Sequence, residues 1–479
     1  MRVLLLNPPY EVGVTPPLGL AYLHAVLEKE GKDASLVDAW NWSIGEICRF
    51  VHRNEYDLVG LSITTPHRFE VIDIARRIKQ SHPGTSIVLG GPHATYMSEQ
   101  MLTHYPFIDY IVRGEGEYKL LNLVESLESR KSLDNVGGLS FRSSGKVVST
   151  EDAPYIQRLD DIPFPSYKNL DLKSYAPYED SPPGFNKVTR APLISSRGCT
   201  YRCIFCSSSC FWGHKWRFHS PAYVVNLMEY LSREFDANYQ RFFDDNFMAN
   251  PKRVIQICTE LRKRGLHRQI IWRCEGRPDV SSREMYQSMK DAGCFLIEFG
   301  VESGTEEGLS FLGKRYTLDQ IRTTFRVTKE LGFVRKAFII LGGPHETEKT
   351  IAKTRKFIEE IDPDRINVFL LTIFPGTDIY ELARREGRVT EDIWLKRSSK
   401  EPTTRYWHDC PTYHPKMKLK DLEREANRMM YWWHVEVKRR SLFYYERDFL
   451  FFMLKHYVMS GKFRRILSNL RWILCGRVK

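Results

Sequence analysis

The sequence lacks any long apolar run. No stretch approaches the roughly 18 consecutive apolar residues that a bilayer-spanning helix requires. The N-terminus also lacks the pattern of a secretory signal peptide, because the short apolar run of residues 3–6 ends at once in Asn7-Pro8-Pro9. These two absences predict a soluble protein of the cytoplasm.

Cysteine is sparse outside one short stretch. The chain has ten cysteines in 479 residues, and six of them are scattered. Secreted disulfide scaffolds are short and rich in cysteine, so this class is excluded and a reducing compartment is indicated. A metal or iron–sulfur site is therefore expected where four cysteines fall within a dozen positions, at Cys199, Cys203, Cys206 and Cys210.

Most of the chain has almost no excess charge. The net charge is +12, but residues 416–479 alone hold 16 Lys and Arg against 6 Asp and Glu. The other 415 residues hold 55 against 53, which excludes a globally basic surface, so no nucleic acid partner is expected. Apolar residues at 42% and charged residues at 27% are near globular averages, which excludes disorder, collagen and coiled coil.

Strands alternate with helices along most of the chain, which predicts an α/β fold of two or three domains. Residues 1–140 are predicted to form a Rossmann-like, doubly wound parallel sheet, and residues 141–189 a hairpin and linker. Residues 190–400 carry six βα units, which suit a partial (β/α)6 TIM-type barrel. Residues 401–479 are predicted to be helical, basic and rich in aromatic residues. In each α/β domain, ligands are expected at the carboxyl ends of the strands.

The predicted strands and helices can be given by residue range. In the first domain, strands are expected at 2–6, 34–38, 58–63, 86–89 and 110–112, and helices at 18–30, 44–53 and 70–81. In the barrel, strands are expected at 193–196, 241–244, 270–274, 295–301, 336–341 and 365–372. The helices between them are expected at 222–234, 251–264, 282–292, 318–331 and 346–360.

Three cysteines follow the first predicted barrel strand with the spacing C-x3-C-x2-C. Cys199, Cys203 and Cys206 on one loop can each ligate one iron of a cubane cluster, which leaves the fourth iron open to another ligand. An open position is typical of catalysis, whereas a structural site completes its ligand set from the protein. The alternative is a structural zinc site that recruits Cys210 or His214, but the paired knuckles of zinc ribbons are absent.

The three cysteines, with the aromatic Phe205 before the last, resemble the signature loop of the radical S-adenosylmethionine enzymes. The resemblance covers about residues 190–400. It implies a [4Fe–4S] cluster whose fourth iron binds S-adenosylmethionine and whose reduction yields a 5′-deoxyadenosyl radical. It also implies an electron donor such as flavodoxin or ferredoxin. It assigns cofactor contacts to Phe205 and to strand-end residues, namely Asp244, Asp245, Glu298, Glu302, Gly342, Gly343 and Pro375.

The N-terminal domain resembles that of the cobalamin-dependent branch of this family. Two of its turns carry the resemblance, and it assigns cobalamin contacts to Gly90, Gly91, Pro92, His93, Gly114, Glu115, Gly116 and Glu117. The D-x-H-x-x-G box that supplies a lower axial histidine is absent, and many members of this branch also lack it. His93 is therefore interpreted as a loop histidine that is not a cobalt ligand, and the lower ligand of cobalt stays open.

The methylthiotransferases also place an α/β domain before such a barrel, but their first domain supplies three cysteines to a second cluster. Here that domain holds only Cys48, so one cluster is expected. The remaining cysteines of the chain do not have the short spacing of metal ligands, and they are expected to be buried as small apolar residues.

The resemblance implies methylation of an unactivated carbon, with no catalytic residue assigned. The alternatives are radical cyclisation or rearrangement with the same cofactors, as in the anaerobic tetrapyrrole-ring cyclase, and a cobalamin-binding regulator without turnover. The aromatic, basic C-terminal region favours a hydrophobic small-molecule or lipid substrate. Its pattern fits either peripheral contact with an anionic membrane or a helical cap over the barrel.

Overall fold

The structure is a computed structural model of the chain, and it describes residues 1–9, 15–173, 175, 189–280, 282–396 and 410–439. These residues form two compact units, each built from separate stretches of the sequence. The first unit comprises the described residues within Met1–Leu172, Ser196–Tyr223 and Ile373–Pro411, and the second those within Lys173–Ser195, Val224–Thr372 and Thr412–Lys479. The domain boundaries expected from the sequence are consecutive and stay a prediction. Among the described residues, no helix is long and apolar enough to cross a membrane.

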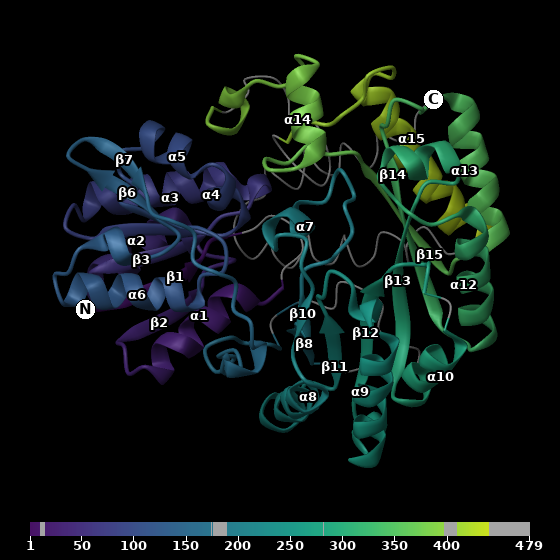
Figure 1. The fold of residues 1–479 in the computed structure, drawn as a ribbon, viewed down its shortest axis with the longest axis horizontal. Coiled ribbons are helices and arrows are strands. Elements are labelled where there is room, and N and C mark those ends of the chain that lie inside the picture. The colour runs from purple at the N-terminus through teal and green to yellow at the C-terminus, as the bar shows by residue number, and fades with distance from the viewer. Residues whose placement is uncertain (10–14, 174, 176–188, 281, 397–409, 440–479) are drawn as a thin grey trace. The chain divides into compact units, whose positions relative to one another are not determined.

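The first unit contains a seven-stranded sheet in the order β2-β1-β3-β4-β5-β6-β7 (Figure 1). The first five strands are parallel, and β6 and β7 extend the sheet as an antiparallel hairpin. The strands are β1 (Val3–Asn7), β2 (Ala34–Asp38), β3 (Leu58–Ser62), β4 (Ser86–Gly90), β5 (Tyr110–Val112), β6 (Leu139–Ser143) and β7 (Lys146–Ser149).

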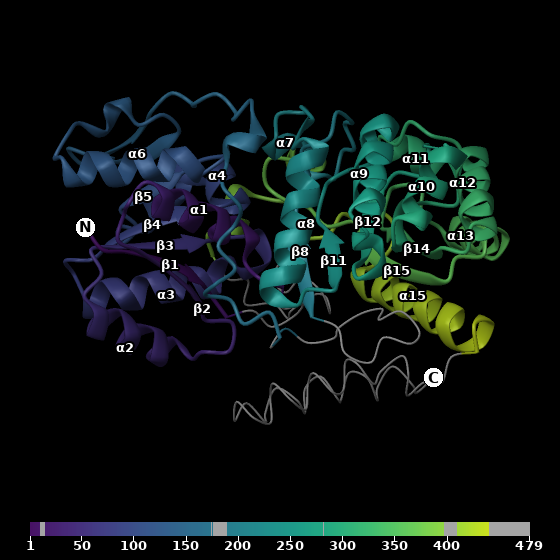
Figure 2. The ribbon, with the colours of Figure 1, turned by 90° about the horizontal axis from the view of Figure 1, so that it is seen from below.

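Helices cover both faces of this sheet, which confirms the doubly wound prediction. Figure 2 shows α1 and α6 on one face and α2 and α3 on the other. The strand β1 is buried along its whole length, as a central strand covered on both sides should be. The helices are α1 (Leu18–Lys29), α2 (Ile44–Asn54), α3 (Arg68–Ser81), α4 (Pro92–Tyr96), α5 (Ser98–His104) and α6 (Glu117–Glu128).

Two short strands in the first unit bracket the predicted cysteine motif. The strands β9 (Ser196–Arg197) and β10 (Arg217–Phe218) pair in antiparallel fashion, with Arg197 opposite Arg217. We call residues 198–216, which this ladder closes into a loop, the cysteine segment. It contains the short helix α7 (Ser207–Phe211), and the same unit also contains α14 (Asp378–Arg385).

The second unit contains a six-stranded parallel sheet in the order β15-β14-β13-β12-β11-β8. Helices line this sheet (Figure 1), which agrees with the expected partial barrel. The strands are β8 (Arg190–Leu193), β11 (Tyr239–Phe242), β12 (Ile271–Gly276), β13 (Cys294–Glu302), β14 (Val334–Leu341) and β15 (Arg365–Leu370). The helices are α8 (Pro221–Phe235), α9 (Pro251–Lys263), α10 (Arg283–Asp291), α11 (Glu306–Phe311), α12 (Leu318–Glu330), α13 (Glu348–Ile361) and α15 (Leu419–Tyr431).

The first barrel strand begins and ends earlier than the sequence predicts. It spans Arg190–Leu193, not 193–196, and its partner β11 likewise ends at Phe242. The pairing stops there because the Ser195 backbone N–H donates to Asp244 Oδ1 (2.8 Å) and its hydroxyl to Asp244 Oδ2 (2.6 Å). The carboxylate thus takes the hydrogen bonds that would otherwise extend the ladder.

The C-terminal region is described only in part. The helix α15 is followed by a π-helical turn, Trp432–Val437, which agrees with the expected helical character. Residues 440–479, which carry most of the aromatic and basic clusters of this region, lie outside the described residues.

Candidate functional site

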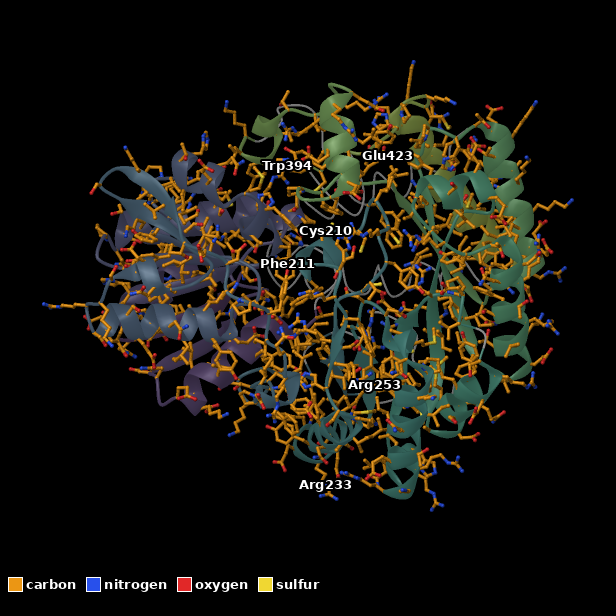
Figure 3. All side chains as sticks on the ribbon, viewed as in Figure 1. Cys210, Phe211, Arg233, Arg253, Trp394 and Glu423 are labelled. Atoms are coloured by element: carbon orange, nitrogen blue, oxygen red, sulfur yellow. The ribbon has the colours of Figure 1, made fainter. Side chains whose placement is uncertain are left out.

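The three cysteines of the motif lie together on the cysteine segment. Cys203 is buried, whereas Cys199 and Cys206 are partly exposed, and none of the three is in a disulfide. A turn brings the last two close, because the Cys206 N–H donates to the Cys203 carbonyl oxygen (3.1 Å). Cys206 directly precedes α7, on which Figure 3 labels Cys210 and Phe211.

The cysteine segment does not have the geometry of a single-metal site. Among the described residues, no three His, Cys, Asp or Glu side chains lie close enough together to hold one metal ion. A cubane cluster differs from such a site because each cysteine ligates a different iron, so its thiols stand farther apart.

Hydrogen bonds to its backbone hold the cysteine segment within the first unit. The Ile379 N–H at the start of α14 donates to the Ile204 carbonyl oxygen (2.9 Å). The Tyr155 hydroxyl donates to the carbonyl oxygen of Phe211 (3.1 Å), and Tyr96 of α4 to that of Ser207 (3.4 Å). Burial raises the pKa of Tyr96 above its ordinary value, so its hydroxyl stays protonated as a donor.

Four buried charges close the base of the cysteine segment, and we call them the ionic clasp: Arg197, Arg217, Glu115 and Glu117. Arg197 donates from Nη1 to Glu115 Oε1 (2.8 Å) and from Nη2 to Glu117 Oε1 (2.6 Å). Arg217 Nη1 donates to both oxygens of Glu115 (2.9 Å each). Burial lowers the pKa of Arg197, but Glu117 and Glu115 outweigh it and raise that pKa above the ordinary arginine value.

The turn that follows β4 lies against the turn that follows β3. Gly91 has a φ of +99°, and a Cβ there would lie 2.8 Å from the Ile63 carbonyl oxygen. The fully buried His93 contacts Thr65 Oγ1 through Nδ1 (3.1 Å), and its Nε2 has no hydrogen-bond partner among the described residues. Burial, with a smaller effect of Arg68, lowers the pKa of His93 to about 3, so the ring is neutral.

Two of the predicted strand-end carboxylates lie in the second unit within networks of polar side chains. Asp244 is almost fully buried, and its carboxylate accepts both hydrogen bonds from Ser195. Glu298 in β13 lies within ion-pair distance of Arg241 (3.2 Å) and Lys336 (3.2 Å), on the same face of the sheet. Asp245, which follows Asp244 in the sequence, is partly exposed.

Glu302, Gly342 and Gly343 also lie in the second unit, at the ends of β13 and β14. Glu302 has a left-handed φ of +64° and forms an ion pair with Lys314 (2.9 Å). Gly342 has a φ of +118°, and a Cβ there would lie 2.7 Å from the Tyr413 carbonyl oxygen. Pro375 belongs instead to the first unit, where the next residue, Gly376, packs against Tyr96.

Comparison with known proteins identifies both halves of the chain. Residues 11–124 match the family model of the B12 binding domain, and residues 193–358 match that of the radical SAM superfamily. A protein of Pyrococcus horikoshii called an uncharacterized methyltransferase is 32% identical over 417 residues, which span 85% of this chain and 88% of that protein. The chain belongs to the cobalamin-dependent radical S-adenosylmethionine enzymes.

Two further comparisons agree with this assignment. The anaerobic magnesium-protoporphyrin IX monomethyl ester cyclase of Rubrivivax gelatinosus is 30% identical over 396 residues, which span 80% of this chain and 70% of the cyclase. The solved structure of OxsB, a cobalamin-dependent S-adenosylmethionine radical enzyme with aqua-cobalamin bound, superposes with a TM-score of 0.71. That likeness covers 98% of this chain and 75% of OxsB at 19% identity, and it shows the fold.

The cofactors of this radical S-adenosylmethionine enzyme are a [4Fe–4S] cluster, S-adenosylmethionine and cobalamin. The cysteine segment fits the cluster, because three cysteine side chains outside any disulfide on one segment are the donors that iron–sulfur clusters use. Cys199, Cys203 and Cys206 are thus the residues that would hold the cluster, and this ligand assignment stays a prediction.

The turns after β3 and β4 fit a bulky ligand at the carboxyl edge of the first sheet. The absence of a side chain at Gly91 allows the two backbones to approach closely, and His93 keeps a buried nitrogen without a partner. All the predicted cobalamin contacts of the two turns stay predictions, namely Gly90, Gly91, Pro92, His93, Gly114, Glu115, Gly116 and Glu117. In the structure the side chains of Glu115 and Glu117 form ion pairs with the two arginines of the ionic clasp.

The S-adenosylmethionine contacts stay predictions as well. Asp244, Asp245, Glu298, Glu302, Gly342 and Gly343 lie in the second unit, whereas Phe205 and Pro375 lie in the first. Gly343 lies against the His345 ring, and Phe205 lies between two of the cysteines in the sequence.

Sequence reasoning missed the residues that shape the cysteine segment. Arg197 and Arg217 lie just outside it, and Trp212 within it contacts both guanidinium groups at 5.5 and 5.7 Å. The only available signal was that two arginines flank the cysteines while two glutamates alternate with glycine in the turn after β5. Nothing in the sequence pairs these groups, because 80 or more residues separate them.

Proposed function

We propose that this enzyme transfers a methyl group to an unactivated carbon of a hydrophobic small molecule or lipid. The observation that carries the proposal is the presence of a B12 binding domain and a three-cysteine segment in one chain. The Pyrococcus horikoshii relative, which is called a methyltransferase, supports it over nearly the whole chain. The aromatic, basic C-terminal region supports the hydrophobic character of the substrate.

In this chemistry the role of the protein is to hold the reacting groups in place and to keep water out of the active site. When bound, the three cofactors supply an electron, a hydrogen-abstracting radical and a transferable methyl group. The cysteine segment presents its thiols from a backbone fixed by Tyr96, Tyr155 and Ile379. Cys203 is largely shielded from solvent, which limits access of water to that ligand.

A labelled methyl group tests the proposal. The anaerobic holoenzyme is incubated with reductant, trideuteromethyl S-adenosylmethionine and a small-molecule extract of cells that lack the enzyme. We expect 5′-deoxyadenosine and at least one extract compound that gains a trideuterated methyl group, as read by mass spectrometry. The variant C203A should form neither product, because one iron loses its ligand. The matched control C48A removes a cysteine of α2 and should retain both.

Radical cyclisation or rearrangement is the second candidate, and the cyclase of Rubrivivax gelatinosus supports it at 30% identity. The same experiment separates the two reactions. An extract compound that is consumed together with formation of 5′-deoxyadenosine, without gain of deuterium, would contradict methylation and favour cyclisation. A regulator without turnover is not favoured, because such a protein would not require the cysteine segment for its function.

The enzyme acts with a reductant, and we propose flavodoxin or ferredoxin as the electron donor. Peripheral contact with an anionic membrane is a further proposal, supported by the excess of basic residues after position 416. The other interpretation of that region, a cap over the barrel, predicts no binding to vesicles that contain anionic lipid. Cosedimentation of the full chain with such vesicles, lost on removal of residues 440–479, is the result expected for membrane contact.

A further inference from the structure

The two ends of the cysteine segment bring like charges together. Arg197 lies directly opposite Arg217 in the ladder of β9 and β10. Directly opposed side chains in antiparallel strands share one face, with their Cβ atoms about 5 Å apart, and like charges there destabilise the pair. The ladder that closes the cysteine segment therefore depends on negative charge supplied from elsewhere.

That negative charge comes from the turn between β5 and α6 of the B12 binding domain. Glu115 accepts from both arginines and from the Ile156 backbone N–H (2.8 Å), and Glu117 accepts from Arg197 Nη2 (2.6 Å). All four side chains of the ionic clasp are at most 8% exposed. In such a site the loss of one charged partner leaves a buried charge without compensation, which is far more costly than on the surface.

The conformation at Arg197 is transmitted to the first cysteine through a single residue. Gly198 has a φ of +86°, and a Cβ there would overlap the Lys215 carbonyl oxygen. The backbone between Arg197 and Cys199 therefore has little freedom to change direction. Aromatic rings fix the guanidinium group as well, since Tyr22 lies 5.4 Å and Trp212 5.5 Å from the Arg197 Cζ atom.

We infer that Glu117 and Arg197 are positioning residues for the iron–sulfur cluster, so that a turn of the B12 binding domain sets the conformation of the cysteine segment. The carboxylate of Glu117 then serves the cluster rather than cobalamin. This inference rests on the cofactors of the family and not on methyl transfer. It therefore stands or falls separately from the proposed reaction.

Three variants of the full-length holoenzyme test the inference: E117Q, R197Q and the double variant E117Q/R197Q. E117Q leaves Arg197 with the carboxylate of Glu115 alone, and R197Q leaves the buried Glu117 without its arginine, whereas the double variant replaces both charges by neutral amides. The matched control is E125Q, which removes a surface carboxylate of the same helix α6 that faces Lys32 (3.5 Å). The readouts are iron, sulfide and cobalt per chain, and the electron paramagnetic resonance spectrum of the reduced cluster with and without S-adenosylmethionine.

We expect E117Q and R197Q to keep their cobalamin and to change the spectrum of the reduced cluster. Formation of 5′-deoxyadenosine should fall about tenfold, as is typical when partners that orient metal ligands are removed. Because R197Q already removes the contact with Glu117, the double variant should show the same fall as R197Q, about tenfold. E125Q should match the wild type in every readout.

Two results would overturn the inference. One is a cluster spectrum, iron content and cleavage rate of E117Q within twofold of those of E125Q. The other is loss of cobalt from E117Q with an unchanged cluster spectrum, which would assign the carboxylate to cobalamin. If the single variants do not fold, the double variant decides, because it leaves neither partner of the Arg197–Glu117 pair charged. A wild-type cluster spectrum and rate in that variant would equally overturn the inference.

Discussion

At the scale of single residues, the burial of His93 makes the stability of the fold depend on pH. Its folded-state pKa of about 3 lies below the ordinary value of about 6.5, because burial disfavours the imidazolium. As the pH falls below about 6.5, the unfolded chain binds a proton that the folded chain does not. The contribution of His93 to stability is thus present above pH 6.5 and is lost progressively towards pH 3.

The variant H93Q should therefore be less sensitive to acid than the wild type. Between pH 6 and 4 we expect the slope of the unfolding free energy against pH to fall by up to one proton, about 1.4 kcal/mol per pH unit. Denaturant titrations at several pH values measure this slope. The exposed His104 of α5 supplies the control H104Q, which should keep the wild-type slope. A slope in H93Q equal to that of the control would contradict the buried, neutral state.

The roles of single residues can be predicted from the sequence in some cases but not in others. Three thiols in a local spacing can be recognised because their chemistry depends on neighbours a few positions away. The partners of Arg197 could not be recognised, because Glu115 and Glu117 precede it by 82 and 80 residues. Alternating Glu and Gly after a strand predicts a ligand turn, which stays a prediction, and nothing in that alternation indicates that the carboxylates also bind arginine side chains.

At the scale of elements, the turn between β4 and α4 depends on a residue without a side chain. Gly91 has a left-handed φ, and a Cβ there would approach the Ile63 carbonyl oxygen, which the turn after β3 holds in place. G91A should force these two turns apart and lower both the cobalamin content and the melting temperature. The cobalt-to-protein ratio after purification and a thermal melt measure the two effects.

Gly84, in the loop before β4, provides the control for this prediction. A Cβ at Gly84 would meet no atom within 4 Å, so G84A should bind cobalamin normally and be as stable as the wild type or slightly more so. If G91A and G84A had equal cobalt content and equal melting temperatures, the close approach of the two turns would have no role in cobalamin binding.

Element boundaries show where a local pattern loses its predictive value. The strands of the first sheet lie within a residue or so of the predicted ranges, because turns and helix stops bound each apolar run. The first barrel strand is misplaced by three residues at each end. Its apolar run continues past the end of the strand to Ile194, and only the distant Asp244 carboxylate, which binds Ser195, determines that the ladder stops before these residues.

At the scale of the whole molecule, the chain order does not match the compact units. The cysteine segment follows the first barrel strand in sequence, yet it belongs to the same unit as the B12 binding sheet. Periodicity and spacing predict elements and motifs along the chain, but not which unit a connecting segment joins. The ionic clasp gives the physical reason, because buried carboxylates of that unit neutralise both arginines at the ends of the segment.

The most direct test of the account is the metal content of anaerobically reconstituted protein, measured together with cleavage of S-adenosylmethionine on reduction. We expect about four irons and about one cobalt per chain, and release of 5′-deoxyadenosine. C203A should keep the cobalt, lose most of the iron and release no 5′-deoxyadenosine. Zinc in place of iron, or intact S-adenosylmethionine after reduction of fully loaded protein, would contradict the account.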